Sequence, residues 1–336
     1  MKEGIAVRPQ KLASYFISKL LRLVLLLFAV SLASFILISF SPVDPVQSYI
    51  GAEASRVSPE QRKEIEAYWG LNEPLIDQYK KWVTAILQGD LGTSLLFRAP
   101  VSHVIGERFV ASFLLMAIAW ILSGVIGLIL GILTGSKHGS WLDRSIRLYC
   151  YILSSTPSFW LGLLLLMTFS VWLGWSPVGL ASPAGILTDE VTIWQKLNHL
   201  ILPALTLSLL GVAQTTLHTR QKLIEVLASE YAIYAKAKGE SDLQLLWRHG
   251  LRNAALPAIS IQFATFGELF GGAVLAEQVF SYPGLGQAVV QAGLGGDIPL
   301  LLGIVLFSTI FVFTGNSLAD IIYRLIDPRL RNGGRQ

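Results

Sequence analysis

The sequence predicts an all-α polytopic membrane protein, and two observations carry this prediction. Hydrophobic residues make up 53% of the 336 residues and charged residues only 14%, whereas a soluble domain carries about 25% charged residues. The apolar residues also gather in six long blocks, and about 20 apolar residues are enough for a helix to cross a bilayer. The same composition excludes an intrinsically disordered chain, which requires low hydrophobicity and high net charge.

Each of the six blocks is expected to form one membrane-spanning helix. The first has 18 uncharged residues after a basic start, more than the roughly 7–15 apolar residues of a signal peptide, so we expect a retained helix. The third is longer than one span requires and contains Pro157, which predicts a kink whose freed carbonyl is satisfied by nearby hydroxyl groups. The predicted spans are residues 23–40, 110–135, 148–175, 200–217, 257–276 and 300–322.

Basic residues set the predicted orientation. With the N-terminus inside, the cytoplasmic segments hold 18 of the 26 Lys and Arg residues. Because cytoplasmic loops collect Lys and Arg, we expect both termini in the cytoplasm. The net charge of +4 then needs no nucleic acid as a partner. The single cysteine, Cys150, excludes an internal disulfide framework and a cysteine metal cluster.

This orientation divides the chain into segments. A stretch of 69 residues outside the membrane is too long for a bare connection, so a structured external loop is expected. The predicted segments are a cytoplasmic N-terminal segment (1–22), the first transmembrane helix (23–40), the external loop (41–109), a membrane domain (110–322) with a cytoplasmic loop (218–256), and a cytoplasmic tail (323–336).

The external loop contains two helix-start patterns. Ser58, Pro59 and Gln61 have the form of a capping box with proline in the first turn, which predicts a helix there. Pro74 predicts a second helix through about Leu87. The loop is either a cap on the membrane domain or a docking surface for an external partner, and the sequence leaves both open.

The second span carries a packing motif. Gly127, Gly131 and Gly135 recur every four residues and therefore lie on one helix face. Small residues at this spacing let two helix backbones approach closely. The alternative is that glycine is simply common in membrane helices.

The sequence predicts that the long cytoplasmic loop forms a rigid knob. Residues 229–238 favour a helix, and Gly239 can end it with a positive φ angle. Ser241 and Gln244 then have the form of a second capping box, which predicts a short helix. Basic residues follow and lead into the membrane at Pro257. Such a knob suits force transmission better than a flexible linker would.

Residues 230–257 carry specific motifs: Glu230-Tyr231-Ala232, Ala235-Lys236-Ala237-Lys238-Gly239 and Arg248-His249-Gly250-Leu251-Arg252-Asn253-Ala254-Ala255-Leu256-Pro257. Together they resemble the "EAA" loop of ABC importer permeases, with the loop length of the dipeptide/oligopeptide/nickel branch. The resemblance covers nearly the whole chain. Other matching positions are Asp44-Pro45, 70–75, Tyr79, Trp82, 89–94, Pro100-Val101, Arg108, 157–162, Leu202-Pro203-Ala204, 280–286 and Asp327-Pro328-Arg329.

The resemblance implies a type I ABC importer permease with six transmembrane helices, in the inner membrane of a bacterium. It implies a second homologous permease in a heterodimer, two ATP-binding subunits that hold ATP and Mg²⁺, and an external solute-binding protein. Substrate would cross by alternating access, and the chain itself would bind no cofactor and contain no catalytic residue. The residues implied to couple to an ATPase are Glu230, Tyr231, Ala232, Ala235, Ala237, Lys238, Gly239, Ser241, Arg248 and His249.

Two other function classes compete with this interpretation. An intramembrane enzyme needs paired acids, or a nucleophile with a base, inside the spans, and the sequence offers only Glu268 and Glu277 near span five and Asp320 near the end of span six. Residues 131–137 lack the Gly-Lys-Ser/Thr of a phosphate-binding loop, and the sequence contains no HExxH motif. A passive channel would not need the motifs of residues 230–257.

The substrate is expected to be nickel or a metal chelate, with di- or oligopeptides as the alternative. The expectation rests on Gly267-Glu268-Leu269-Phe270-Gly271-Gly272, which is similar to the corresponding stretch of nickel-importer permeases. A carboxylate in a span is costly if it faces lipid, so Glu268 should face the bundle interior or a watery cavity. The candidate residues of the translocation path are Glu268, Pro157 and Glu277, and no metal site is assigned.

Overall fold

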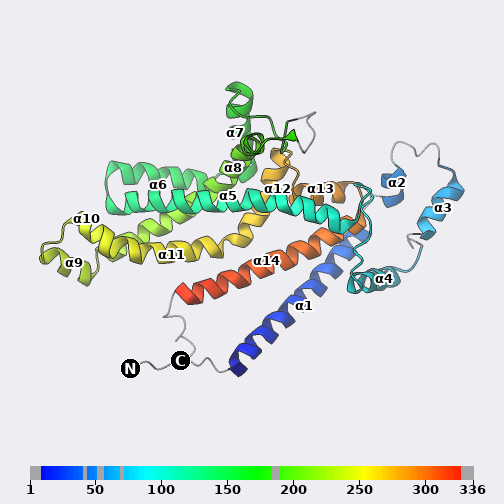
Figure 1. The fold of residues 1–336 in the computed structure, drawn as a ribbon, viewed down its shortest axis with the longest axis horizontal. Coiled ribbons are helices and arrows are strands. Elements are labelled where there is room, and N and C mark those ends of the chain that lie inside the picture. Colours follow the sequence, from blue (N-terminus) through cyan, green and yellow to red (C-terminus); the bar gives the residue numbers. More distant parts are fainter. Residues whose placement is uncertain (1–8, 41–43, 51–56, 69–71, 184–189, 327–336) are drawn as a thin grey trace. The chain divides into compact units, whose positions relative to one another are not determined.

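A computed structural model describes residues 9–40, 44–50, 57–68, 72–183 and 190–326 (Figure 1). This part of the chain is almost entirely helical, and its β-pairing is limited to an isolated bridge between Thr93 and Pro100. The elements are α1 (Pro9–Ser39), α2 (Pro45–Ile50), α3 (Pro59–Tyr68), α4 (Leu75–Leu87), α5 (Val101–Ser136), α6 (Trp141–Ser154), α7 (Ser158–Leu165), η2 (Leu166–Trp172), α8 (Ile193–Leu227), α9 (Glu230–Ala237), α10 (Asp242–Leu245), η4 (Leu246–Gly250), α11 (Leu251–Ala264), α12 (Phe266–Val279), α13 (Leu285–Leu294) and α14 (Ile298–Ile326).

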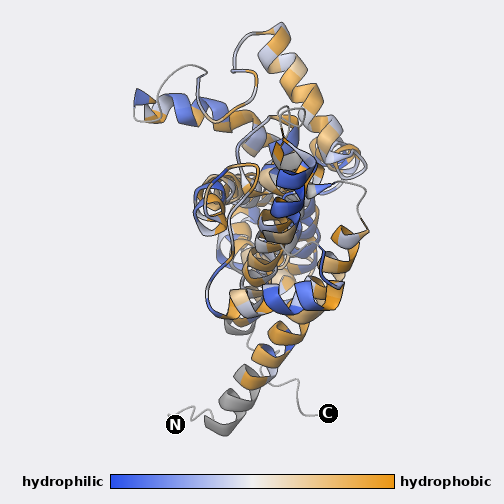
Figure 2. Ribbon diagram, turned by 90° about the vertical axis from the view of Figure 1, so that its right-hand side faces the viewer, coloured by the Kyte–Doolittle hydropathy of each residue, from blue (hydrophilic) through white to orange (hydrophobic). Residues whose placement is uncertain are grey.

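The described chain has four helices that could each cross a membrane and two bent helix pairs that could each form one further span, and these lie at the six predicted spans. The four helices are Ile17–Ser39 of α1, α5, α8 and Ile298–Ile322 of α14. The two bent pairs are α6 with α7 and the π-helix η2, and α11 with α12. Figure 2 shows that hydrophobic residues predominate in the coloured part of α1, the first helix of the chain. The helices at the second and fourth predicted spans are longer than the apolar blocks from which the spans were predicted. α5 and α8 continue as helix on both sides of these blocks.

The break in the third span is much larger than the predicted kink. α6 and α7 differ in direction by 109°. Pro157 has no N–H to continue α6, and its extended backbone, with φ −61° and ψ 136°, instead begins α7. The carbonyl oxygen of Leu153, to which residue 157 would donate in a continuous helix, accepts from the N–H of Thr156 at 3.1 Å, so a backbone group and not a hydroxyl satisfies it. The hydroxyl of Thr156 donates instead to the carbonyl oxygen of Ile152 at 2.7 Å, which also accepts from the N–H of Ser155. The fifth span bends by 55° at Thr265.

The chain divides into two compact units. Unit 1 combines residues 1–107 with 288–314, and unit 2 combines residues 108–287 with 315–336. In unit 1, α4 packs on α1, where the hydroxyl groups of Tyr79 and Ser31 are 2.9 Å apart. The rings of Tyr79 and Phe35 meet edge to face with centroids 5.3 Å apart. The buried carboxylate of Asp297, just before α14, accepts a hydrogen bond from Ser94 Oγ at 2.6 Å. These contacts fix the loop that the sequence predicts to be structured.

Both predicted helices of this loop are confirmed. Ser58 Oγ accepts from the N–H of Gln61 at 3.2 Å, and Gln61 Oε1 accepts from the N–H of Ser58 at 3.0 Å, which completes the capping box of α3. α4 begins after Pro74 and ends at Leu87. Gly89 follows with φ +85° and turns the chain away.

In unit 2, α5 packs closely on α8 through the three glycines. A Cβ added to Gly127 would lie 2.6 Å from the Cβ of Thr215, so no larger side chain fits without a shift of the helices. The packing interpretation of the glycine repeat is confirmed, and the partner helix is α8. The facing pairs are Gly127 with Thr215, Gly131 with Thr219, and Gly135 with Leu223.

A buried polar cluster joins α11 to α5 and α8. The side-chain amide of Gln262 donates to the carbonyl oxygen of Trp120 at 2.6 Å and to Ser123 Oγ at 2.8 Å. Its oxygen accepts from Thr215 Oγ1 at 3.0 Å, and the indole N–H of Trp120 donates to the carbonyl oxygen of Gln262 at 2.9 Å. Because the polar groups of Gln262 are partnered inside the bundle, the cluster holds three helices together.

Candidate functional site

Residues 229–250, which we call the arm, connect α8 to α11 and carry the predicted coupling residues. Figure 1 shows α9 and α10 at the opposite end of unit 2 from α7 and α12. α9 begins after Ser229, with Glu230 in its first turn, where a negative charge complements the helix dipole. Ala232 and Ala235 are buried against Leu245 of α10. Alanine at these two positions lets α9 and α10 pack closely, so the arm has a small core of its own.

The turn between α9 and α10 has the geometry that the sequence predicts. Lys238 ends α9, and Gly239 follows with φ +95°. A Cβ on Gly239 would meet nothing within 4 Å, so the requirement for glycine is conformational and not steric. Ser241 Oγ accepts from the N–H of Gln244 at 3.4 Å, and Gln244 Oε1 accepts from the N–H of Ser241 at 2.9 Å. The second capping box is therefore confirmed.

The end of the arm differs from the predicted short helix with separate basic residues. α10 continues through the π-helical turn η4 directly into α11. In this turn, Arg248 Nη1 lies 3.2 Å from Glu240 Oε1, and His249 Nε2 lies 3.3 Å from Glu240 Oε2. Arg248 and His249 are among the coupling residues expected from the motifs of residues 230–257, whereas Glu240 is not. No local pattern marks Glu240, because the π-helical turn that brings its partners near is not encoded by a motif.

Five large apolar and aromatic side chains of α9, α10 and η4 are exposed. Tyr231 is 46% exposed, and the exposed fraction is above 60% for the other four. The ammonium group of Lys238 lies 4.6 Å from the ring centre of Tyr234, which keeps a cation beside this ring. Several large exposed apolar side chains on a small rigid element are typical of an element that is covered by a partner. The other four are Ile233, Tyr234, Leu243 and Trp247.

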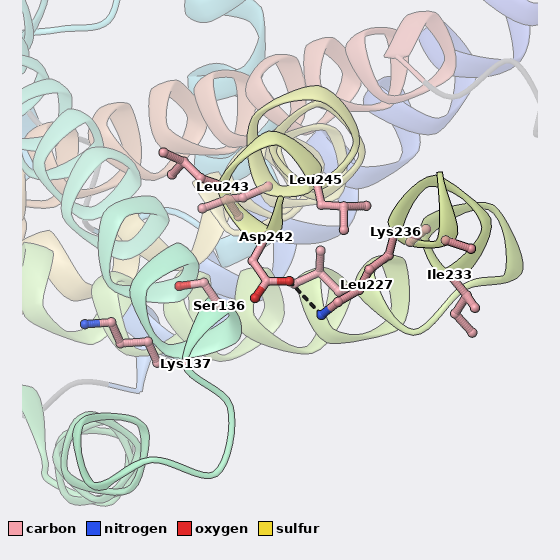
Figure 3. A pocket seen from close by; sticks show the side chains of 11 residues that line it. Ser136, Lys137, Leu227, Ile233, Lys236, Asp242, Leu243 and Leu245 are labelled. Atoms are coloured by element: carbon pink, nitrogen blue, oxygen red, sulfur yellow. Dashed lines mark hydrogen bonds and ion pairs between the residues drawn. The ribbon is translucent and has the colours of Figure 1, made fainter. Parts of the chain in front are cut away.

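A cavity of about 660 Å³ lies between the arm and the end of α5 (Figure 3). Ala237, the remaining predicted coupling residue, lines it together with Leu227. Lys236 and Asp242 form an ion pair of 2.7 Å at its edge, marked by the dashed line in Figure 3. The structure therefore brings all ten predicted coupling residues together in one arm with a small core, exposed apolar side chains and an adjoining cavity.

The three candidate residues of the translocation path lie in different environments. Pro157 forms the break between α6 and α7. Glu268 is exposed in the first turn of α12, and the described residues offer it no hydrogen bond or ion pair. Nothing lies within 4 Å of a Cβ placed on Gly271, one turn further along α12. This stretch of α12 therefore presents a bare surface with one carboxylate.

Glu277, in contrast, is 1% exposed and fully engaged within unit 2. Its Oε1 accepts from Ser112 Oγ of α5 at 2.5 Å, and its Oε2 accepts from the N–H of Gln287 in α13 at 3.0 Å. Ser112 Oγ also accepts from the N–H of Leu285 at 2.7 Å. Burial raises the pKa of neighbouring Tyr282 to about 12, with a further contribution from Glu277. Glu277 thus anchors the first turn of α13 to α5, which explains the motif at residues 280–286 structurally.

Comparisons with known proteins agree with this architecture. A family model for a binding-protein-dependent transport system inner membrane component matches residues 127–332, and its N-terminal companion matches residues 12–115. A solved chain titled as an amino acid ABC transporter with histidines matches with a TM-score of 0.50 at 12% identity, over 66% of this chain and 94% of that chain. At that identity the likeness concerns the fold alone.

Three curated relatives match over nearly their whole length. The oligopeptide transport system permease protein AppB of Bacillus subtilis (strain 168) is 37% identical over 95% of this chain and 99% of its own. The di/tripeptide transport system permease protein DppB of Pseudomonas aeruginosa (strain UCBPP-PA14) is 36% identical over 91% and 95%. A putative peptide transport system permease protein of Brucella abortus (strain 2308) is 35% identical over 90% and 94%.

These names favour the peptide alternative over the nickel expectation. The nickel expectation rested on six residues of α12, whereas the similarity to these relatives extends over at least 90% of the chain. The matched family models, the full-length relatives and the apolar spans all indicate a membrane-embedded transport subunit. The chain therefore belongs to the family of binding-protein-dependent transport system inner membrane components, as a multi-pass inner-membrane permease subunit of an ABC importer whose ATP is hydrolysed by partner subunits.

Proposed function

We propose that this chain is a permease subunit of a peptide importer, paired with a second, homologous permease subunit in a heterodimer. The observation that carries the peptide assignment is the 35–37% identity to three peptide permeases over 90–95% of the chain. Nickel remains the second candidate, favoured only by the similarity of residues 267–272 to nickel-importer permeases. Among the described residues, no group of three His, Cys, Asp or Glu side chains lies together, so this part of the chain offers no preformed protein cage for a free metal ion.

The arm is proposed to seat in one ATP-binding subunit. Its small core of Ala232, Ala235 and Leu245 gives it a fixed shape, and its exposed aromatic and aliphatic side chains supply a surface to bury. Movement of the ATP-binding subunits then displaces the arm as a body and reorients the membrane helices. Peptide delivered by the solute-binding protein crosses by alternating access, without covalent change. No cofactor is needed in this chain, since ATP and Mg²⁺ belong to the partner subunits.

Glu268 is proposed to face the translocation path. A charged side chain in a span rarely faces lipid, and in the described structure Glu268 faces neither a cation nor a hydrogen-bond donor of its own chain. A carboxylate there would attract the terminal ammonium group of a peptide without holding it tightly, as transport requires. The break at Pro157 would help to shape the same path, and Glu277 would support it by fixing the start of α13.

The substrate proposal is tested by reconstituting the four-subunit complex with its binding protein in proteoliposomes. We expect ATP-dependent accumulation of radiolabelled trialanine and none of radiolabelled Ni²⁺. Accumulation of Ni²⁺ without trialanine would overturn the peptide assignment and restore the nickel candidate. Identification of the ligand that copurifies with the binding protein gives an independent answer.

The role of Glu268 is tested by Glu268→Gln, which keeps the shape and removes the charge. We expect uptake of trialanine to fall about tenfold, as for a lost interaction of about 1.4 kcal/mol. Uptake of N-acetyl-trialanine, which has no ammonium group, should stay unchanged relative to the wild type. Glu190→Gln, at an exposed glutamate outside the spans, is the matched control and should alter neither. An equal loss for both peptides would show that Glu268 does not recognise the ammonium group.

A further inference from the structure

A buried ion pair joins α6 to α8 close to the root of the arm. Asp143 is 1% exposed and Arg220 7% exposed. Arg220 Nε donates to Asp143 Oδ1 at 2.6 Å, and Arg220 Nη2 donates to Asp143 Oδ2 at 2.8 Å. The two parallel hydrogen bonds form a fork that fixes the angle as well as the distance between the side chains.

The same carboxylate also fixes the turn between α5 and α6. Asp143 Oδ2 accepts from the N–H of Gly139 at 2.9 Å, and Gly139 has φ +79°. Ser140 Oγ accepts from the N–H of Asp143 at 3.2 Å and caps α6. One side chain therefore ties together the end of α5, the start of α6 and α8.

The ion pair holds the start of α6 to α8, and apolar packing continues further along α6, where Cys150 and Leu153 pack against Ala213. Apolar packing is non-directional, whereas the forked ion pair fixes the relative orientation of the two helices. α5 is held to α8 separately by its glycine contacts, of which Gly135 with Leu223 is the nearest to the arm.

Arg220 lies seven residues before the end of α8 at Leu227, and the arm begins two residues later. At about 1.5 Å per residue, the ion pair is about 10 Å from the root of the arm along the helix. On the other side, α6 leads to the 109° break and α7. The ion pair thus lies where a displacement of the arm would pass from α8 into α6.

We propose that Asp143 and Arg220 are a positioning pair that transmits arm movement from α8 to α6, a role that rests on the importer function proposed above. The argument from stability alone is weaker. Removing two charges from water costs free energy, so buried ion pairs contribute little net stability compared with apolar packing. What a forked pair adds is a unique geometry, and a stiff joint between two helices requires that geometry.

The test separates coupling from folding. Arg220→Lys keeps the charge but cannot make the two-point fork. We expect the complex to assemble in wild-type amount, while the peptide transported per ATP hydrolysed falls at least fivefold. Arg144→Lys is the matched control, since Arg144 is an exposed arginine on α6 next to Asp143, and it should keep the wild-type ratio.

A second measurement follows the contact between α6 and α8 directly, through the distance between two spin labels. Spin labels on Leu148→Cys in α6, an exposed site, and Lys222→Cys in α8, a half-exposed site, are introduced with Cys150→Ser. The distance distribution between them should stay narrow and unchanged through the ATP cycle in the otherwise wild-type complex, and should broaden with Arg220→Lys. A normal transport ratio together with a narrow distribution in Arg220→Lys would overturn the proposal.

Two further outcomes are informative. If Arg220→Lys fails to assemble, Asp143→Asn with Arg220→Gln removes both charges together and is measured in the same way. If that variant also fails to assemble, or assembles with a normal ratio, the pair is structural only and the proposal is wrong. ATPase stimulation by the loaded binding protein is recorded in parallel, so that an error in the assumed substrate is distinguished from an error about the pair.

Discussion

The arm and the membrane bundle of unit 2 are specified in different ways. In the arm, the turn between α9 and α10 follows from neighbouring residues: Ser241 caps α10, and Gly239 supplies a positive φ. In the bundle, the polar contacts join residues far apart in the chain, such as Asp143 with Arg220. The difference teaches that the shape of α9, α10 and the turn between them is set locally, whereas the bundle depends on mutual fit. Substitutions in that part of the arm should therefore act on coupling, and substitutions that overpack the bundle should act on assembly, whereas the Asp143–Arg220 pair is the place in the bundle where coupling is expected to be lost without loss of assembly.

The largest expected effect is in the chemical labelling of single cysteines on the two sides of the membrane. Labelling of each site in intact cells is expected to be all or none. Single cysteines at Ser58 and Ser182, in a Cys150→Ser background, should react with an impermeant thiol reagent in intact cells. One at Ser241, in the arm, should react only after lysis. The expectation follows from the distribution of basic residues. Labelling of the Ser241 position from outside would invert the predicted orientation.

The next largest effect is expected from the bundle. Gly131→Ala places a Cβ against Thr219 and 2.9 Å from the carbonyl oxygen of Thr216. Overpacking of this kind costs about 1–3 kcal/mol, so we expect a lower yield and a lower melting temperature of the complex. Gly106→Ala, on the same helix but with nothing within 4 Å, is the control and should melt like the wild type. Equal melting temperatures for both variants would show that α5 does not depend on this close approach.

In the arm, Gly239→Val should uncouple without disassembly. A β-branched residue is strained at φ +95°, and relief of that strain should displace α10 while the membrane helices stay packed. We expect normal yield and loss of ATPase stimulation by the binding protein. Gly239→Asn tests the same site with a side chain that tolerates positive φ, and it should retain most stimulation. If the Gly239→Val complex kept normal ATPase stimulation by the binding protein, the turn at Gly239 would not be required for coupling.

The smallest effect compares two helix caps of the same design. Ser241→Ala and Ser58→Ala each remove a capping box, at a cost of about 1 kcal/mol of local stability. Hydrogen exchange should speed up in α10 for the first variant and in α3 for the second. Only Ser241→Ala should also lower ATPase stimulation, because only this cap lies in the arm. A similar loss of stimulation for Ser58→Ala would show that coupling is sensitive to stability in general.

The extent of correct prediction follows the same division. The six apolar blocks, both capping boxes and the turn at Gly239 were predicted, because periodicity and caps are written in adjacent residues. The glycine repeat was also recognised, although its partner α8 was not. The 109° break was underestimated, since a proline shows where a helix is interrupted but not how far the next helix turns.

The long-range polar contacts of the arm and the bundle could not be predicted from the sequence. Glu240, Asp143 and Gln262 have no spacing relative to Arg248, Arg220 or Thr215 that indicates a partner. Their roles depend on which helices meet, and that is decided by packing over the whole bundle. The nickel expectation is less well supported than the peptide alternative for a related reason: it rests on six residues of α12, whereas the similarity to the peptide permeases extends over nearly the whole chain.

The length of α8 bears on how the importer responds to its lipids. Its 35 residues make a rod of about 52 Å, compared with a hydrocarbon core about 30 Å thick. Most of its apolar stretch, 61%, is buried inside the protein, so neighbouring helices rather than lipid chain length fix its depth. The spacing between the arm and the headgroups is then a property of the protein. When a cell adjusts its acyl chains to temperature, the bilayer around this permease would change in thickness. The distance through which the arm moves relative to the membrane helices would stay the same.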